Sequence, residues 1–149
     1  MFSVQRRIEF RDTDAAGIVH FSAFFPMMES AEHELLRHLG LSVMQPLENG
    51  SHLTWPRVSA TCNYLNAAKF EDLLTIEVSI IKIGTTSLTY RFHFRCQDIP
   101  IANGEIIAVC CLWQKDGTLE KFAITEQLRK TLLPMLASEN AIGLGNILP

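Results

Sequence analysis

The spacing of apolar residues changes early in the chain from every second position to helical intervals. Over residues 2–10 apolar and polar side chains alternate, as they do in a strand with one buried face. From about residue 22 to residue 39 apolar residues recur at the spacing of a helix face. These apolar positions are Phe24, Met28, Ala31, Leu35 and Leu39, and the polar residues mostly on the other side are Glu29, Glu32, His33, Arg37 and His38. The pattern predicts a strand followed by one long amphipathic helix.

Residue types at both ends of this segment agree with a helix. Ser22 suits the N-cap, Pro26 is tolerated in the first turn, and Gly40 suits the position that follows the last turn.

The remainder of the chain is rich in strand-like runs. After a loop over residues 41–51, strands are predicted at about 53–65, 73–83, 86–96 and 105–115, and a short helix at about 125–137. Gly84-Thr85 and the segment from Asp98 to Gly104 resemble hairpin turns, and Asp116-Gly117 a further turn. Strands joined by hairpins after a single helix favour an α+β fold with an antiparallel sheet packed on that helix.

Composition narrows the possible functions. A chain of 149 residues with a net charge of −3 suits one globular domain and lacks the basic excess of nucleic-acid-binding proteins. No apolar run reaches the ~20 residues that span a bilayer, and the N-terminus has no signal-peptide core. We therefore expect a cytoplasmic protein that does not span a membrane and does not bind nucleic acid.

Cysteines and histidines give weak signals for catalysis or metal binding. Cys62, Cys96, Cys110 and Cys111 show no C-x-x-C spacing, and they are predicted to be packed, reduced thiols. His33 and His38 are five residues apart, which does not place them on one helical face as metal ligands, and solvated side chains are expected instead. We predict no metal site and no cofactor.

One short segment before the helix carries the candidate chemistry. Residues 12–21 read Asp-Thr-Asp-Ala-Ala-Gly-Ile-Val-His-Phe, so two acids and a glycine precede a helix start. These residue types also form ordinary turns, in which Asp12 or Thr13 would cap the following structure. A helix N-terminus has unpaired N–H groups and the positive end of a dipole, and it suits an anion or a developing oxyanion.

This segment resembles the active-site signature of the 4-hydroxybenzoyl-CoA thioesterase family of hotdog-fold proteins, roughly D-x-D-x-x-G-x-V followed by aromatics and a helix. The similarity extends to Glu29, to Trp55-Pro56-Arg57-Val58 and to residues 70–77, and covers about residues 2–135. It implies one hotdog domain over residues 1–137, a long central helix wrapped by an antiparallel sheet, and a loose tail over 138–149.

The resemblance also implies an acyl-CoA thioesterase and roles for individual residues. Asp14 would be the catalytic carboxylate, while Asp12 would hold the loop. A backbone N–H near Phe21 would bind the oxyanion, and His20 is either a wall residue or a proton donor to the leaving thiolate. Asp14 could attack the thioester directly or activate water, and helix-end N–H groups beside it would favour attack slightly.

Substrate recognition is less well defined by the resemblance. Glu29 falls on a position where the benzoyl-CoA enzyme meets a ring hydroxyl, although a solvated glutamate is an equal alternative. Gly17 and Trp55 join Glu29 as predicted substrate-binding residues. The Gly84 hairpin lacks the arginines that relatives carry there, which leaves Lys82, Arg57 or Lys69 as candidates for the coenzyme phosphates.

The predicted substrate is an aromatic acyl-CoA of the 4-hydroxybenzoyl or 1,4-dihydroxy-2-naphthoyl type. Alternatives are a thioesterase for short aliphatic acyl-CoA and a non-catalytic hotdog module that binds acyl-CoA or an acyl carrier protein. A dehydratase would need a histidine and an acid in a different helical setting. The resemblance further implies a homodimer or homotetramer, because the hotdog cleft forms between subunits.

Overall fold

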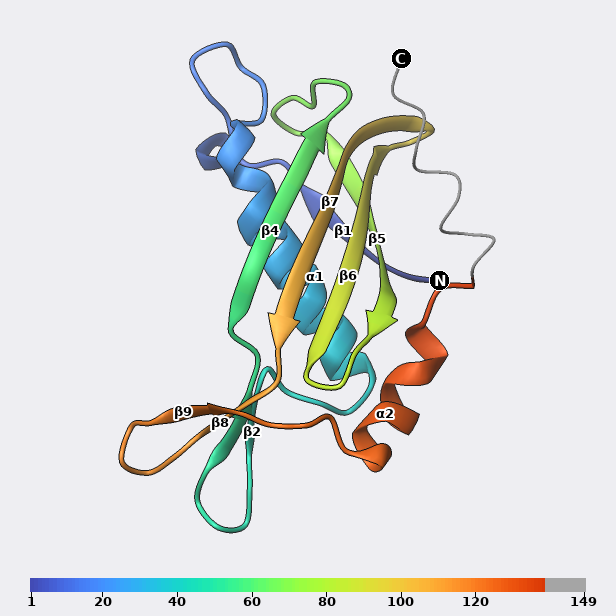
Figure 1. The fold of residues 1–149 in the computed structure, drawn as a ribbon. Helices are drawn as coiled ribbons and strands as arrows, with labels where there is room; N and C mark the ends of the chain where they lie inside the picture. Colours follow the sequence, from blue (N-terminus) through green and yellow to red (C-terminus); the bar gives the residue numbers. More distant parts are fainter. Residues whose placement is uncertain (139–149) are drawn as a thin grey trace.

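A computed structural model describes residues 1–138, and it places one long helix against the concave face of an antiparallel sheet (Figure 1). The helix, α1, spans Phe24–His38. The sheet has the strand order β1-β5-β6-β7-β4. Its strands are β1 (Phe2–Arg7), β4 (Arg57–Tyr64), β5 (Leu73–Ile83), β6 (Ser87–Cys96) and β7 (Ile99–Val109). The α+β hotdog prediction is confirmed. Apart from residue 138, the predicted tail lies outside the described residues.

A second, smaller sheet lies beyond one end of the large one (Figure 1). It contains β2 (Met44–Pro46), β3 (His52–Thr54), β8 (Cys111–Trp113) and β9 (Leu119–Lys121), in the order β2-β3-β8-β9. Helix α2 (Glu126–Leu132) follows, and short 3₁₀ turns cover Phe10–Asp12, Phe21–Ala23 and Leu133–Met135. Sequence patterns missed β2 and β9, because strands of three residues leave almost no periodic signal.

Two predicted long strands are each divided between the two sheets. The run at 53–65 breaks at Trp55-Pro56, and the run at 105–115 breaks at Cys110. At these breaks the chain passes from one sheet to the other, and the Val109 N–H donates to the Pro56 carbonyl at 2.9 Å. The first strand ends at Arg7 instead of residue 10, because a 3₁₀ turn begins at Phe10.

A hairpin joins β6 and β7 as predicted, but its turn does not extend from Asp98 to Gly104. The β6–β7 turn is at Gln97-Asp98, with Gln97 at a φ of 54°, and β7 starts at Ile99. Gly104 lies inside β7, where an added Cβ would collide with the Met28 sulfur and lie 3.2 Å from the Thr61 carbonyl. The glycine therefore serves close packing of the helix on the sheet and not a turn.

The two ends of α1 differ in how well they were predicted. Gly40 has a φ of 73°, the Gly40 N–H donates to the Arg37 carbonyl, and the Leu41 N–H donates to the Leu36 carbonyl. This is the Schellman arrangement that a glycine permits. Ser22 is not the N-cap, because a 3₁₀ turn precedes α1 and the helix begins after Ala23.

The final helix is shorter than predicted. Thr125 caps α2 through the Leu128 N–H, and a 3₁₀ turn that contains Pro134 follows at Leu133–Met135. Proline removes the N–H that a continuing α-helix would need. The chain beyond this turn meets the large sheet, where the Ala137 N–H donates to the Ile80 carbonyl at 2.7 Å.

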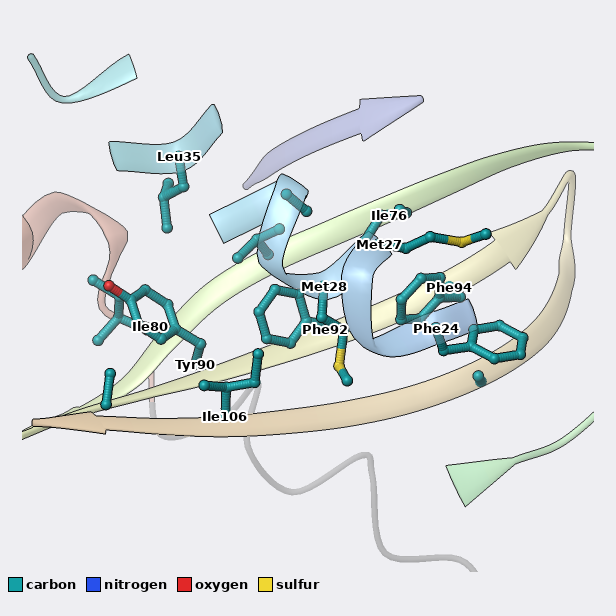
Figure 2. Packing of buried hydrophobic residues seen from close by; sticks show 14 of the residues in the cluster. Phe24, Met27, Met28, Leu35, Ile76, Ile80, Tyr90, Phe92, Phe94 and Ile106 are labelled. Carbon is teal, nitrogen blue, oxygen red and sulfur yellow. The ribbon is translucent and has the colours of Figure 1, made fainter. Parts of the chain in front are cut away.

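The core lies between α1 and the concave face of the sheet. Figure 2 shows Phe24, Met27, Met28 and Leu35 of the helix facing side chains from β5, β6 and β7. Those sheet residues are Ile76, Ile80, Tyr90, Phe92, Phe94 and Ile106. Phe24 meets Phe94 edge to face, with ring centroids 5.2 Å apart. Burial of this apolar surface fixes the helix, and thereby the loop that precedes it, against the sheet.

We predict that Gly104→Val lowers the free energy of unfolding by about 1–3 kcal/mol, because the new side chain overpacks the contact with Met28. Chemical denaturation of Gly104→Val, Met28→Ala and the double variant measures this effect. The double variant should be more stable than the sum of the two single changes predicts. Strictly additive losses would show that Met28 is not the residue that excludes a side chain at position 104.

Candidate active site

The signature segment forms a small hairpin that ends at the helix start. The Asp14 N–H donates to the Ile18 carbonyl at 2.9 Å, and the His20 N–H donates to the Asp12 carbonyl at 2.8 Å. Thr13 pairs with Val19 between these bonds. The turn is closed by the Gly17 N–H, which donates to the Asp14 carbonyl, and Gly17 has a φ of 77°. Gly17 thus has a conformational role, since left-handed backbone favours glycine.

Asp14 is half-buried at the turn, and its two carboxylate oxygens differ. Oδ1 accepts a hydrogen bond from the Ala16 N–H at 2.8 Å. In the described part of the chain Oδ2 has no hydrogen bond or ion pair. The N–H that holds the carboxylate therefore belongs to the turn, and not to the start of α1 as the sequence suggested. One oxygen fixes the side chain while the other is available to a reactant.

Asp12 anchors the same loop from the interior. It is 7% exposed, its Oδ2 accepts from the Glu9 N–H at 2.8 Å, and its Oδ1 lies 3.6 Å from Arg6 Nη2. A further contact ties the loop to the neighbouring chain, where the Val19 N–H donates to the Ala68 carbonyl at 2.9 Å. These bonds agree with the prediction that Asp12 holds the loop.

The peptide between His20 and Phe21 presents a free donor. The His20 carbonyl accepts from the Ala23 N–H at 2.9 Å, so the Phe21 N–H on the opposite side of this trans peptide points away from the turn. Within residues 1–138 that N–H has no hydrogen-bond partner. The Tyr64 hydroxyl donates to the Phe21 carbonyl at 2.8 Å, which ties the helix entrance to the end of β4.

His20 has a defined orientation. Its Nδ1 accepts from the Ser22 N–H at 3.3 Å and lies 2.7 Å from the Ser22 hydroxyl. A ring nitrogen that accepts a backbone N–H carries no proton, so the neutral imidazole has its proton on Nε2. His20 also lines a cavity of about 610 Å³ beside the loop, together with Arg6, Arg11, Ser22, Met27 and Ser30. Asp14 and Phe21 do not line this cavity.

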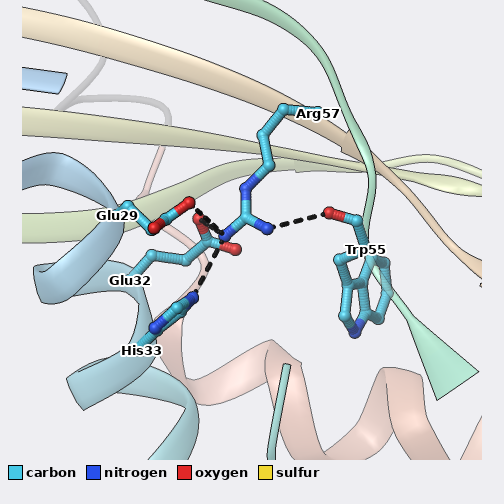
Figure 3. A network of polar contacts seen from close by, with 5 residues as sticks. All are labelled: Glu29, Glu32, His33, Trp55 and Arg57. Atoms are coloured by element: carbon cyan, nitrogen blue, oxygen red, sulfur yellow. Dashed lines mark hydrogen bonds and ion pairs between the residues drawn. The ribbon is translucent and has the colours of Figure 1, made fainter. Parts of the chain in front are cut away.

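A buried ion pair lies further along α1. Glu32 is 0% exposed, and its Oε2 accepts from Arg57 Nη2 at 2.8 Å. The same guanidinium donates from Nη1 to the Trp55 carbonyl at 3.1 Å and lies 3.3 Å from His33 Nε2. Figure 3 shows Glu29, Glu32 and His33 projecting from α1 towards Arg57 at the start of β4. We call these four residues the Arg57 cluster.

Charge and burial shape this cluster. Burial raises the pKa of Glu32, while the adjacent Arg57 opposes that shift. Burial and the Arg57 charge lower the pKa of His33. Because arginine only donates, His33 Nε2 accepts, and the imidazole is neutral with its proton on Nδ1. Burial also raises the pKa of Tyr90, whose hydroxyl interacts with the Glu32 charge and has no hydrogen-bond partner among residues 1–138.

The sequence assigned several of these residues differently. Glu32 was predicted on the solvent-facing side of the helix, but its side chain is buried. His33 was predicted to be solvated, but its ring lies against Arg57. Arg57, a candidate for the coenzyme phosphates, is hydrogen-bonded inside the cluster and is 26% exposed. Glu32 follows Met28 by four residues and precedes Leu35 by three, so its place within the apolar stripe was the available signal.

The two other predicted substrate contacts lie in contrasting places. Glu29 is exposed, and its Oε2 is 3.9 Å from Arg57 Nη2. The Trp55 side chain is buried in the core at 2% exposed, and in Figure 3 its indole points away from the Arg57 cluster. Trp55 therefore supports the start of β4 and holds Arg57 through its carbonyl, and its ring does not line an open site.

The four cysteines are free thiols, with Cys110 and Cys111 buried and Cys62 and Cys96 half-buried. Burial raises the pKa of Cys110 to about 11 and also raises that of Cys62 and Cys111. A raised pKa lowers the thiolate fraction at neutral pH and disfavours a cysteine nucleophile.

Within residues 1–138 no group of three or more His, Cys, Asp or Glu side chains could hold a metal ion. None of the helices in this part of the chain is long and apolar enough to cross a membrane.

Comparisons with known proteins agree with this fold. Residues 16–102 match the model of the thioesterase superfamily, so the chain belongs to that family and is a thioester hydrolase. The acyl-CoA thioester hydrolase YbgC of Escherichia coli O157:H7 is 27% identical over 123 residues, which are 80% of this chain and 90% of the relative.

Two further relatives have more specific names. The 1,4-dihydroxy-2-naphthoyl-CoA hydrolase of Synechococcus elongatus is 25% identical over 131 residues, 88% of this chain and 94% of that protein. A solved gentisyl-coenzyme A thioesterase is 27% identical with a TM-score of 0.74, and the match covers 89% of this chain and 99% of that structure. The family predicted from the signature is confirmed.

The buried carboxyl of Glu32 gives a signed pH prediction. A group whose pKa is higher in the folded state stabilises the fold fully below its ordinary pKa, and that stability is lost as pH rises through the raised value. Glutamine stays neutral, so the stability of the wild type relative to Glu32→Gln should fall from about pH 4 to pH 7. Thermal unfolding across this range measures the difference.

Glu34→Gln is the matched control, because Glu34 lies on the same helix in an exposed pair with Arg37. If the wild type instead became more stable relative to Glu32→Gln as pH rises, the pKa of Glu32 would not be raised in the folded state.

Proposed function

We propose that this thioesterase hydrolyses acyl-CoA, with Asp14 as the catalytic carboxylate and an aromatic acyl group as the substrate. The observation that carries the proposal is the pairing of a fixed Asp14, with Oδ2 free, and an unpartnered Phe21 N–H at the helix entrance. The named relatives act on coenzyme A thioesters, and two of them act on hydroxylated aromatic acyl groups.

The chemistry follows from these groups. Asp14 Oδ2 attacks the thioester carbonyl carbon, and the Phe21 N–H stabilises the oxyanion that forms. The C–S bond then breaks, coenzyme A leaves as its thiolate, and an Asp14–acyl anhydride remains. Water opens the anhydride and releases the acid. The alternative, in which Asp14 deprotonates water for direct attack, uses the same carboxylate.

Edge strand β4 supports the proposed dimer. In the described chain β4 pairs with β7 on one side and has no strand on the other. Most of its side chains are exposed, including Val58 at 64% and Tyr64 at 48%. A long open edge with apolar side chains is a liability for a monomer. A second copy that covers this edge would also enclose the helix side of β4, between Phe21 and the Arg57 cluster.

The catalytic assignment predicts that Asp14→Asn lowers kcat by at least about 10², because the amide keeps the shape of the side chain but not its charge. Steady-state hydrolysis of benzoyl-CoA and 4-hydroxybenzoyl-CoA, with circular dichroism to verify folding, measures this loss. Asp98→Asn, in the exposed β6–β7 turn, is the control and should retain activity. Normal turnover by folded Asp14→Asn would refute the role of Asp14, and absence of turnover in the wild type would favour a binding module.

The dimer predicts that sedimentation at micromolar concentration gives a dimer or tetramer. Val58→Lys places a charge on the β4 edge and should weaken association by about tenfold or more, since lysines on edge strands oppose pairing. Activity should fall with the dimer fraction. A fully active monomer would contradict an inter-subunit site.

A further inference from the structure

Arg6 is a charged residue in an otherwise apolar row. The side chains of β1 alternate between the two faces of the sheet, and Phe2, Val4 and Arg6 lie on the more buried face. Ile8, two residues further along, is fully buried. Strand β1 is the edge of the sheet opposite to β4, so the row lies away from the proposed subunit contact (Figure 1). A charge in such a row needs a partner, because burial without one costs its hydration.

The described chain gives Arg6 only a loose partner. Asp12 Oδ1 lies 3.6 Å from Arg6 Nη2, which is beyond hydrogen-bond length. Asp12 already accepts from the Glu9 N–H through its other oxygen. Arg6 Nε is buried without a hydrogen-bond partner, and no other N–H of the guanidinium forms a hydrogen bond among residues 1–138. The side chain is 31% exposed, so part of it is open to a ligand.

The cavity of about 610 Å³ beside the hairpin that carries Asp14 brings further donors next to Arg6. Ser30 also lines this cavity, and its hydroxyl forms no hydrogen bond within the described part of the chain. His20 lines it as well, and its Nε2 remains a donor because Nδ1 accepts from the Ser22 N–H. A cavity bordered by so many donors suits an anion.

Charge favours an anion with a single negative charge. Arg6 and Arg11 line the cavity together with one carboxylate, that of Asp12. Arg11 is exposed and pairs with Glu9 at 2.6 Å, so Arg6 is the cation with free donors. A carboxylate matches the fork of an arginine through two parallel hydrogen bonds. A phosphate dianion would place a second negative charge near Asp12, which a carboxylate avoids.

A second cavity of about 410 Å³ adjoins the first and has apolar walls. Its apolar residues are Val4, Met27, Ala31 and Ile76. Arg6, Met27 and Ser30 line both cavities, so the cation lies at their common wall. Glu34 also lines the second cavity, but it is exposed and paired with Arg37 at 2.8 Å. Both volumes are in the range of small-ligand pockets, and a ligand with a charged head and an apolar body matches the two together.

We propose that these two cavities form a binding site for a small organic carboxylate, which we call the Arg6 site. The carboxylate binds Arg6 and Ser30, and the apolar part of the ligand packs on Met27. Asp14 and Phe21 line neither cavity, so the Arg6 site is separate from the groups of the proposed reaction. Binding there is therefore independent of hydrolysis at Asp14.

The Arg6 site shares residues with the hairpin that carries Asp14. Asp12, Thr13 and His20 line the first cavity, and the His20 N–H closes the hairpin on the Asp12 carbonyl at 2.8 Å. A ligand in the cavity therefore contacts both arms of the hairpin. Because a ligand that binds only the closed hairpin opposes its opening, occupancy stabilises the hairpin and makes the Arg6 site an effector site.

The test measures binding of hexanoate and benzoate to the full chain by isothermal titration calorimetry. Each should bind at one site per chain. The neutral amides hexanamide and benzamide should bind at least about tenfold more weakly, because they lack the charge that pairs with Arg6. Inorganic phosphate, which has no apolar body, should be weaker by a similar factor. Phosphate that binds as tightly as hexanoate, or amides that equal the acids, would overturn the assignment of a carboxylate.

Variants locate the ligand. Arg6→Met should lower hexanoate affinity by about ten- to a hundredfold, since it removes the charged hydrogen bonds, and it should fold because methionine continues the apolar row. Arg6→Lys keeps the charge without the planar fork and should be intermediate. Ser30→Leu, at an exposed position of α1, should fill the site and weaken binding while Arg6 stays in place. Lys130→Met, at an exposed lysine of α2, is the control and should bind hexanoate as the wild type does. Unchanged affinity in either Arg6→Met or Ser30→Leu would overturn the site.

Two further measurements separate the Arg6 site from the proposed active site. Asp14→Asn should bind hexanoate as the wild type does, because Asp14 lines neither cavity. Loss of binding in Asp14→Asn with normal binding in Arg6→Met would overturn the Arg6 site and leave the proposed function intact. Hexanoate should also slow amide hydrogen exchange over residues 12–20 in the wild type and not in Arg6→Met. Exchange that hexanoate leaves unchanged would overturn the effector role.

Discussion

The packing of α1 into the concave face of the five-stranded sheet is the constraint on which the other features depend. An added Cβ at Gly104 would collide with the Met28 sulfur, and the Phe24 ring packs edge to face on Phe94. Because the helix is fixed along its length, both the hairpin before it and the charged residues on its flank acquire definite positions. A domain of this size gains most of its stability from such burial and can then carry polar groups that contribute little.

Two polar features use this fixed helix in different ways. At its entrance, short-range hydrogen bonds close the hairpin and leave one carboxylate oxygen and one N–H free. On its flank, Glu32 and Arg57 join residues 25 positions apart, which ties the helix to edge strand β4. In the proposed mechanism the first arrangement supplies the reactive groups, and the second joins the helix to the sheet.

Edge strand β4 connects these two features with each other and is the strand of the proposed subunit contact. It carries Arg57 at its start and Tyr64 at its end, and Tyr64 bonds the Phe21 carbonyl. Any partner that covers this strand would change the solvation of Glu29 and Arg57 together.

Local patterns in the sequence determined the helix, the main strands, the Gly40 stop and the family, because each depends on residues that are neighbours along the chain. Gly104 could not be distinguished from a turn glycine, since its reason is the approach of Met28 from another element. Glu32 looked like a surface residue, and Trp55 like a pocket residue, until the sheet enclosed them. The free Asp14 oxygen, the unpartnered Phe21 N–H and the Arg57 cluster were decided by tertiary structure. Burial and long-range hydrogen bonding depend on which segments meet, and residue spacing alone does not encode that.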